Sequence, residues 1–107
     1  MSLVFKALAD PTRRRVLELL REQDMSAGDL ASHFTFSKPT MTGHFSVLRE
    51  AGLVAAEKHG KQVIYRLKLS VLEDALLGFA ESFGLTATSS RNKRTSKPIP
   101  KKGATKT

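Results

Sequence analysis

Residues Ser37 to Gly52 combine short hydrogen-bonding side chains with a helical spacing of apolar ones. Hydroxyl groups and an imidazole held on one side of a helix can form hydrogen bonds with base edges in the DNA major groove. The other side of such a helix must be apolar enough to fasten it to the protein. The candidate DNA contacts on this helix, none of them acidic, are Ser37, Lys38, Pro39, Thr40, Thr42, Gly43, His44, Ser46 and Arg49.

The same stretch carries the signals that begin and end a helix. Ser37 can cap the first turn, and Pro39 lacks the amide hydrogen that would go unpaired there. Gly52 suits the left-handed conformation that ends many helices. An ordinary amphipathic surface helix would share these signals, although its exposed side usually mixes glutamate with lysine. Three apolar residues at the spacing i, i+4, i+7 predict one buried stripe: Met41, Phe45 and Leu48.

The preceding residues predict the other half of a helix-turn-helix. Asp10 before a proline predicts a helix that runs to about Arg21. Ser26, followed three residues later by an aspartate, predicts a further helix over Met25–Phe34. Thr35–Phe36 leaves so short a connection that the two helices should cross steeply, as in a helix-turn-helix.

Three consecutive arginines, Arg13, Arg14 and Arg15, are expected in the first turn of the helix that follows Asp10. Cations at this end oppose the helix dipole. The arginines either contact phosphates or form a solvated, intramolecularly paired cluster, and both interpretations stay open.

After Gly52 the apolar spacing changes from helical to alternating. The segments LVAAEK and QVIYRLK flank His59-Gly60 and predict a β-hairpin over residues 53–68. A basic hairpin that follows a DNA-reading helix is placed to meet the DNA backbone or minor groove as a wing. A solvated hairpin end is the alternative. The candidate contacts at the tip are Lys58, His59 and Lys61.

The last expected helix, which Ser70 and Glu73 would open as a capping box, is apolar on more than one side. A domain of about 85 residues has little core with which to cover such a helix. We therefore expect a second copy of the chain to cover it, together with a short opening helix. The expected dimer interface is Leu3, Phe5, Leu72, Ala75, Leu76, Phe79, Ala80 and Phe83.

The net charge of +8 is concentrated at the C-terminal end. Residues 86–107 contain seven of the 18 basic residues and no acid, so residues 1–85 are close to neutral. The composition predicts one folded domain over 1–85 and a disordered basic tail over 86–107. The tail either adds sequence-independent DNA affinity or serves only as a solubilising extension.

The composition also argues against several classes of protein. The absence of cysteine excludes disulfides and thiolate metal sites. No stretch is long enough to span a membrane, and residues 1–10 do not form a signal peptide, so a cytoplasmic location is expected. There are no paired carboxylates on a cleft-forming scaffold and no glycine-rich phosphate loop, so an enzyme is not expected.

Three segments, LADPTRRRVLELL, SKPTMTGHFSVLREAGLV and GKQVIYRL, resemble the ArsR/SmtB family of bacterial winged-helix repressors in order and spacing, over roughly residues 3–84. The resemblance implies a mainly α fold with a two-stranded wing, in the order α-α-α-α-β-β-α. It also implies a homodimer that binds a palindromic operator in double-stranded DNA and represses transcription, often of its own operon.

The family's metal sensors carry cysteines on the first helix of the helix-turn-helix, or Asp/His pairs on the last helix. Here the first region reads SAGDLASHF and the last helix has no histidine, while His33, His44 and His59 lie in three different elements. The chain thus resembles the metal-less autorepressor branch, and neither a metal nor a cofactor is expected.

His44 matches the family's usual recognition-helix histidine, whereas Gly43 stands where many relatives have a larger polar or basic residue. Two alternatives remain open. One is a repressor that responds to a non-metal small molecule, and the other is a winged-helix module that binds protein. An acidic recognition face would favour the protein-binding module, and this face is expected to have no acid.

Overall fold

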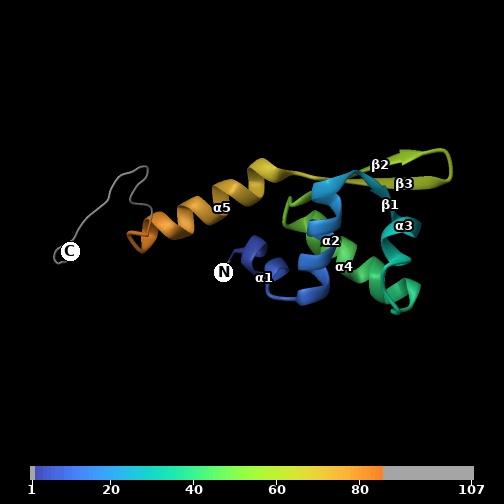
Figure 1. The fold of residues 1–107 in the computed structure, drawn as a ribbon, viewed down its shortest axis with the longest axis horizontal. Helices are drawn as coiled ribbons and strands as arrows, with labels where there is room; N and C mark the ends of the chain where they lie inside the picture. Colours follow the sequence, from blue (N-terminus) through green and yellow to red (C-terminus); the bar gives the residue numbers. More distant parts are fainter. Residues whose placement is uncertain (1, 86–107) are drawn as a thin grey trace. The chain divides into compact units, whose positions relative to one another are not determined.

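The computed structural model describes residues 2–85, and the predicted tail, residues 86–107, lies outside them. Within the described range five helices and a three-stranded antiparallel sheet occur (Figure 1). A boundary between two compact units falls inside the last helix, between Leu72 and Glu73. The elements are α1 (Leu3–Leu8), α2 (Pro11–Glu22), β1 (Met25–Ser26), α3 (Ala27–Ala31), α4 (Lys38–Glu50), β2 (Val54–His59), β3 (Gln62–Leu67) and α5 (Leu69–Ser82).

The five helices and the hairpin confirm the predicted mainly α fold with a two-stranded wing, and one further strand, which the sequence did not predict, extends the sheet. Met25 and Ser26 form the short strand β1, which pairs antiparallel with Tyr65 and Ile64 of β3. The strand order is therefore β1-β3-β2, with the longest strands forming the hairpin. This pairing satisfies backbone groups that would otherwise lie unpaired between α2 and α3.

Helix α3 is shorter than the predicted helix over Met25–Phe34, for a reason visible at each end. Residues 25–26 belong to the sheet, and the Ser26 side chain caps α3 by accepting a hydrogen bond from the Asp29 amide at 3.0 Å. After Ala31 the chain turns through Ser32 and Phe34 and reaches α4 by a six-residue connection, Ser32–Ser37. The predicted two-residue connection is therefore wrong.

The core of the first unit consists of buried side chains that pack around α4. Helix α4 contacts α1, α2 and β2, and Leu48 is completely buried. On the sheet side the Tyr65 ring packs against Phe45, with ring centroids 4.8 Å apart. The core residues are Val4, Ala7, Val16, Leu17, Leu20, Leu30, Met41, Phe45, Leu48, Leu53, Val54 and Tyr65.

Helix α4 begins and ends as its sequence predicts. The Ser37 hydroxyl accepts a hydrogen bond from the Thr40 amide at 3.3 Å. Gly52 has φ of 77°, a conformation that glycine adopts at little cost, and it directs the chain into β2. Since both ends and the buried stripe are encoded locally, this helix is the best predicted element of the fold.

The hairpin follows the predicted alternation. Ala56 pairs with Tyr65, Lys58 pairs with Val63, and the turn is made by Gly60 and Lys61. Gly60 has φ of 62°, which accounts for glycine at the tip. Because Tyr65 is buried against α4, the face of the hairpin that carries Tyr65, Val63 and Lys58 is the one turned toward the helices.

Helix α5 begins two residues earlier than a cap at Ser70 predicts. Its first residue is Leu69, so Ser70 lies inside the helix and does not cap it, and the predicted capping box is wrong. The Val71 amide instead donates to the Lys68 carbonyl at 3.1 Å. No residue of α5 is buried, and 48% of the Phe79 surface and 66% of the Phe83 surface are exposed.

Candidate nucleic-acid interface

The middle of α4 presents a strip of short side chains to solvent. Its exposed residues lie on the side away from Met41 and Leu48, with Lys38 near one end and Arg49 near the other. Glu50 is also exposed in the last turn, so the expectation that this face carries no acid is wrong. The predicted candidates that are exposed are Ser37, Lys38, Pro39, Thr40, Thr42, Gly43, Ser46 and Arg49.

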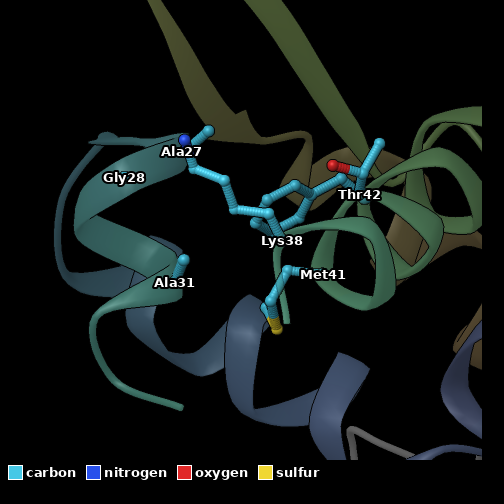
Figure 2. Close-up of a pocket in the computed structure, with 7 residues that line it drawn as sticks. Ala27, Gly28, Ala31, Lys38, Met41 and Thr42 are labelled. Atoms are coloured by element: carbon cyan, nitrogen blue, oxygen red, sulfur yellow. The ribbon is translucent and has the colours of Figure 1, made fainter. Parts of the chain in front are cut away.

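One border of this strip is a groove of about 280 Å³ between α3 and α4. Figure 2 shows its small residues Ala27 and Ala31 on α3, and the Lys38 side chain extending from α4 toward Ala27. Met41 and Phe45 contribute apolar atoms to the lining. Because α3 carries only small side chains here, the sides of Lys38 and Thr42 that face the groove are left open.

His44 lies apart from these exposed residues, although the sequence interpretation grouped it with Thr42 and Ser46. Only 15% of its side-chain surface is exposed. Its Nδ1 atom is 3.3 Å from Nη1 of Arg13 and 3.9 Å from Oδ2 of Asp10, and its ring lies 6.0 Å from that of Phe36. His44 therefore connects α4 to the start of α2 and is poorly placed to reach a base.

Arg13 is the centre of this connection. Its Nε donates to the Ala7 carbonyl at 2.8 Å and its Nη2 to the Lys6 carbonyl at 3.1 Å, so the guanidinium binds the last carbonyls of α1. Its Nη1 reaches His44 on α4. One side chain thus connects α1, α2 and α4, which explains a cation in the first turn of a helix.

The other two arginines are also paired within the chain. Arg14 donates to the Leu8 carbonyl at 2.8 Å, and Arg15 forms an ion pair with Glu18 at 3.1 Å. Of the two interpretations that the sequence left open for Arg13–Arg15, the structure favours the intramolecularly paired cluster. The signal that could have shown this is the position of the arginines, one turn after the end of a short helix whose carbonyls need partners.

Electrostatics at this connection favour the charged form of Asp10. Burial by itself raises the pKa of Asp10, but the hydrogen bond from the Arg13 amide and the charges of His44 and Arg13 outweigh it, so the pKa is lowered. At pH values above the range in which aspartates usually titrate, Asp10 therefore stabilises the folded state. This contribution is lost as the pH falls through its lowered pKa. The carboxylate caps α2 and faces His44 at once.

Arg49 places a positive charge beside the sheet. Burial raises the pKa of the Tyr65 hydroxyl, and the nearby Arg49 charge opposes this shift. Ser46, Arg49 and Glu50 together line a shallow hollow at the end of α4. Arg49 is thus positioned between the exposed strip of α4 and the face of the hairpin that carries Tyr65.

The wing tip does not form one basic patch. Strand alternation puts Lys58 on the face turned toward the helices and His59 on the opposite face. His59 Nε2 lies 3.2 Å from Glu57 Oε1, so an acid competes for this side chain. Lys61 occupies the turn itself. Lys58 and Lys61 are therefore the tip residues best placed to meet a polyanion that contacts α4.

Among residues 2–85 no three histidine, aspartate or glutamate side chains come together in a way that could hold a metal ion. Nor does this part of the chain contain a helix with the length and apolar character needed to cross a membrane. His33 is exposed on the loop after α3.

Replacement of Arg13 by lysine tests the connection between α1, α2 and α4. A lysine keeps the charge, but its three N–H donors are all on one nitrogen, which cannot take the separate positions of Nε, Nη1 and Nη2. We expect Arg13→Lys to lower the free energy of unfolding by about 1–3 kcal/mol and to change the ¹⁵N chemical shifts of the His44 ring. Arg14→Lys is the matched control, because Arg14 binds α1 without reaching α4. Equal stability losses and an unchanged His44 spectrum in both variants would contradict this role for Arg13.

Known proteins are similar to the part of the chain that carries α4. Residues 10–56, which hold the connection at Asp10 and all of α4, match the model described as "Bacterial regulatory protein, arsR family". The "Transcriptional repressor SdpR" of Bacillus subtilis is 43% identical over 76 residues, which cover 71% of this chain and 84% of that protein. The "Arsenical resistance operon repressor" of Staphylococcus xylosus is 37% identical over 73 residues, covering 68% and 70%.

Solved structures agree with these sequence relatives. The ArsR family transcriptional regulator RHA00566 has a TM-score of 0.72 and 29% identity, and the match covers 78% of this chain and 91% of that one. An ArsR-like transcriptional regulator from Rhodococcus has a TM-score of 0.67 and 33% identity, with coverage of 77% and 76%. These relatives are transcriptional regulators and not enzymes. The chain is therefore a DNA-binding transcriptional regulator that belongs to the arsR family of bacterial regulatory proteins.

Proposed function

We propose that this chain represses transcription as a homodimer that places α4 of each copy in the major groove of a palindromic operator. The two helices would occupy half-sites about one helical turn of DNA apart, roughly 34 Å. Bound in this way, the dimer would occlude a promoter in the bacterial cytoplasm. The observation that carries the proposal is the division of α4 into a buried stripe and an exposed strip of short polar side chains.

The distribution of charge supports this orientation. Exposed basic side chains lie at both ends of α4, at Lys38 and Arg49, and at the tip of the hairpin, at Lys58 and Lys61. Lysine and arginine in such positions contact phosphates and fix the register, while the hydroxyls between them are short enough to meet base edges. Glu50 lies at the far end of the strip, where it would disfavour phosphate contact and so limit the footprint of α4.

The exposed apolar side chains of α5 support the proposed dimer. Leu76, Phe79 and Phe83 expose about half or more of their surface, although each is large and apolar. Burying such side chains contributes roughly 25 cal/mol per Å² of apolar surface removed from water, which favours a partner for this helix. A second copy of α5 is the occupant that a two-fold operator requires.

We further propose that repression needs no metal and that the chain's own operon is among its targets. The full sequence has no cysteine with which to form a thiolate site. The relative in Bacillus subtilis is a transcriptional repressor, and the resemblance to the metal-less autorepressor branch motivates the choice of target.

Thr42→Ala tests the reading role of α4. We expect it to weaken binding to an operator duplex by about 1–3 kcal/mol, with little effect on a scrambled duplex, because the substitution removes a hydrogen bond to a base and none to a phosphate. The measurement is fluorescence anisotropy on both duplexes, with the operator taken from a footprint upstream of the gene. Thr12→Ala, in the first turn of α2, is the control. If both duplexes lose affinity equally in Thr42→Ala, this side chain does not read sequence.

Phe79→Glu tests the dimer. The added charge would be buried in a two-fold interface, so we expect monomers in sedimentation velocity and an operator affinity at least tenfold weaker. Leu77→Glu makes the same change at an exposed residue that is not among the expected interface residues, and should leave the dimer intact. An unmutated protein that sediments as a monomer while binding the operator would contradict the proposed assembly.

A further inference from the structure

Gly43 lies in the middle of α4, on the exposed strip, and nothing in the described structure requires a glycine there. A Cβ atom added at this position would meet nothing within 4 Å. Its φ is not among the positive ones, which belong to Gly52, Gly60 and Gly84. Neither packing nor backbone conformation therefore excludes alanine.

A glycine inside a helix has a cost in stability. It loses more conformational freedom on folding than alanine does, so an exposed helical glycine destabilises the folded state. Since the open space around Gly43 would accept a methyl group, the described residues give no reason why glycine, and not alanine, occupies this position. A molecule that contacts the outside of α4 would account for it.

The surroundings of Gly43 indicate what such a molecule must be like. Its neighbours on the helix surface, three or four residues away, are Pro39, Thr40, Ser46 and Val47, and all are short. They form a low strip about 12 Å long, which spans roughly three to four base-pair steps of DNA. Pro39, Val47 and the methyl group of Thr40 make much of this strip apolar.

We propose that Gly43 determines operator specificity by letting the backbone of α4 approach the base edges, where a thymine methyl group fills the space of the missing side chain. This inference rests on the proposed function. Thymine presents the one methyl group on the major-groove edge of unmodified DNA. Glycine has no side-chain donor or acceptor, so it forms no side-chain hydrogen bond with the polar edges of guanine, cytosine or adenine. The operator half-site thus carries a thymine opposite Gly43.

The first test compares Gly43→Ala with Gly78→Ala. Gly78 also lies inside a helix, α5, and a Cβ there meets nothing within 4 Å. Both substitutions are expected to raise the melting temperature by several degrees, because both relieve the same helical cost. Only Gly43→Ala is expected to weaken binding to the operator duplex, by about tenfold, with binding to a scrambled duplex unchanged.

The second test removes the methyl group from the DNA. Each thymine of a half-site is replaced in turn by uracil, which keeps every hydrogen-bonding group. One symmetric pair of replacements is expected to weaken binding of the unmutated protein about fifteenfold, the combined effect of two buried methyl groups, one in each half-site. In Gly43→Ala the same pair is expected to restore part of the lost affinity, since uracil leaves room for the added Cβ.

The operator duplex for both tests is selected from a random duplex pool with the unmutated full-length protein. If no sequence is enriched, the proposed function and this inference both fail. If a sequence is enriched but Gly43→Ala binds it as tightly as the unmutated protein does, or loses the scrambled duplex equally, only the role of Gly43 is overturned. If no uracil replacement affects the unmutated protein more than Gly43→Ala, the assignment of the thymine methyl group is overturned.

Discussion

The burial of one narrow stripe of α4 is the constraint on which the rest of the molecule depends. Met41, Phe45 and Leu48 lie almost wholly inside the protein, against α1, α2 and β2. Removing such side chains to alanine typically destabilises a protein by about 2–5 kcal/mol, so rotation of α4 about its axis would be prohibitively costly. A helix fixed in this way presents the same exposed strip at all times, and a fixed strip is what discrimination between base sequences needs.

The Arg13 side chain also holds α4 in position, but its role differs from that of the apolar stripe. The stripe sets which face of α4 is exposed, whereas the contact of Arg13 with His44 ties the middle of α4 to α1 and α2. A cation at the start of α2 is unfavourable by itself. The carbonyl groups at the end of α1 provide the negative partial charge that offsets it, so the unusual arginine follows from the short α1.

Sequence reasoning succeeded where a signal is local. Ser37, the Met41–Phe45–Leu48 spacing and Gly52 define α4 within one stretch, and Gly60 defines the hairpin turn. It failed where a distant partner decides the structure. Met25 and Ser26 form a strand because β3 lies beside them, and nothing near them in the sequence indicates this pairing.

His44 is an intermediate case. It lies three residues after Met41 and four before Leu48, so helical geometry alone puts it beside the buried stripe. Because His44 is polar, the sequence favoured placing it on the exposed face of α4. In the structure Asp10 and Arg13 provide polar partners for it on the side that packs against α2. The exposure of Glu50 at the end of the strip follows from helical spacing in the same way. The burial of His44 and the exposure of Glu50 could both have been predicted from the helical spacing, while strand β1 could not.

In the proposed mechanism α4 distinguishes one DNA sequence from another, while the basic residues 86–107 contribute charge without discrimination. The most direct measurement is a pair of salt titrations, on the operator and on a scrambled duplex, for the full chain and for a chain without residues 86–107. We expect the shorter chain to keep the ratio of the two affinities within about twofold, because α4 is unchanged in it. Its salt dependence should be flatter by roughly 0.9 in slope for each phosphate that the tail no longer neutralises. A shorter chain that binds both duplexes equally well would show that discrimination depends on the tail and not on α4.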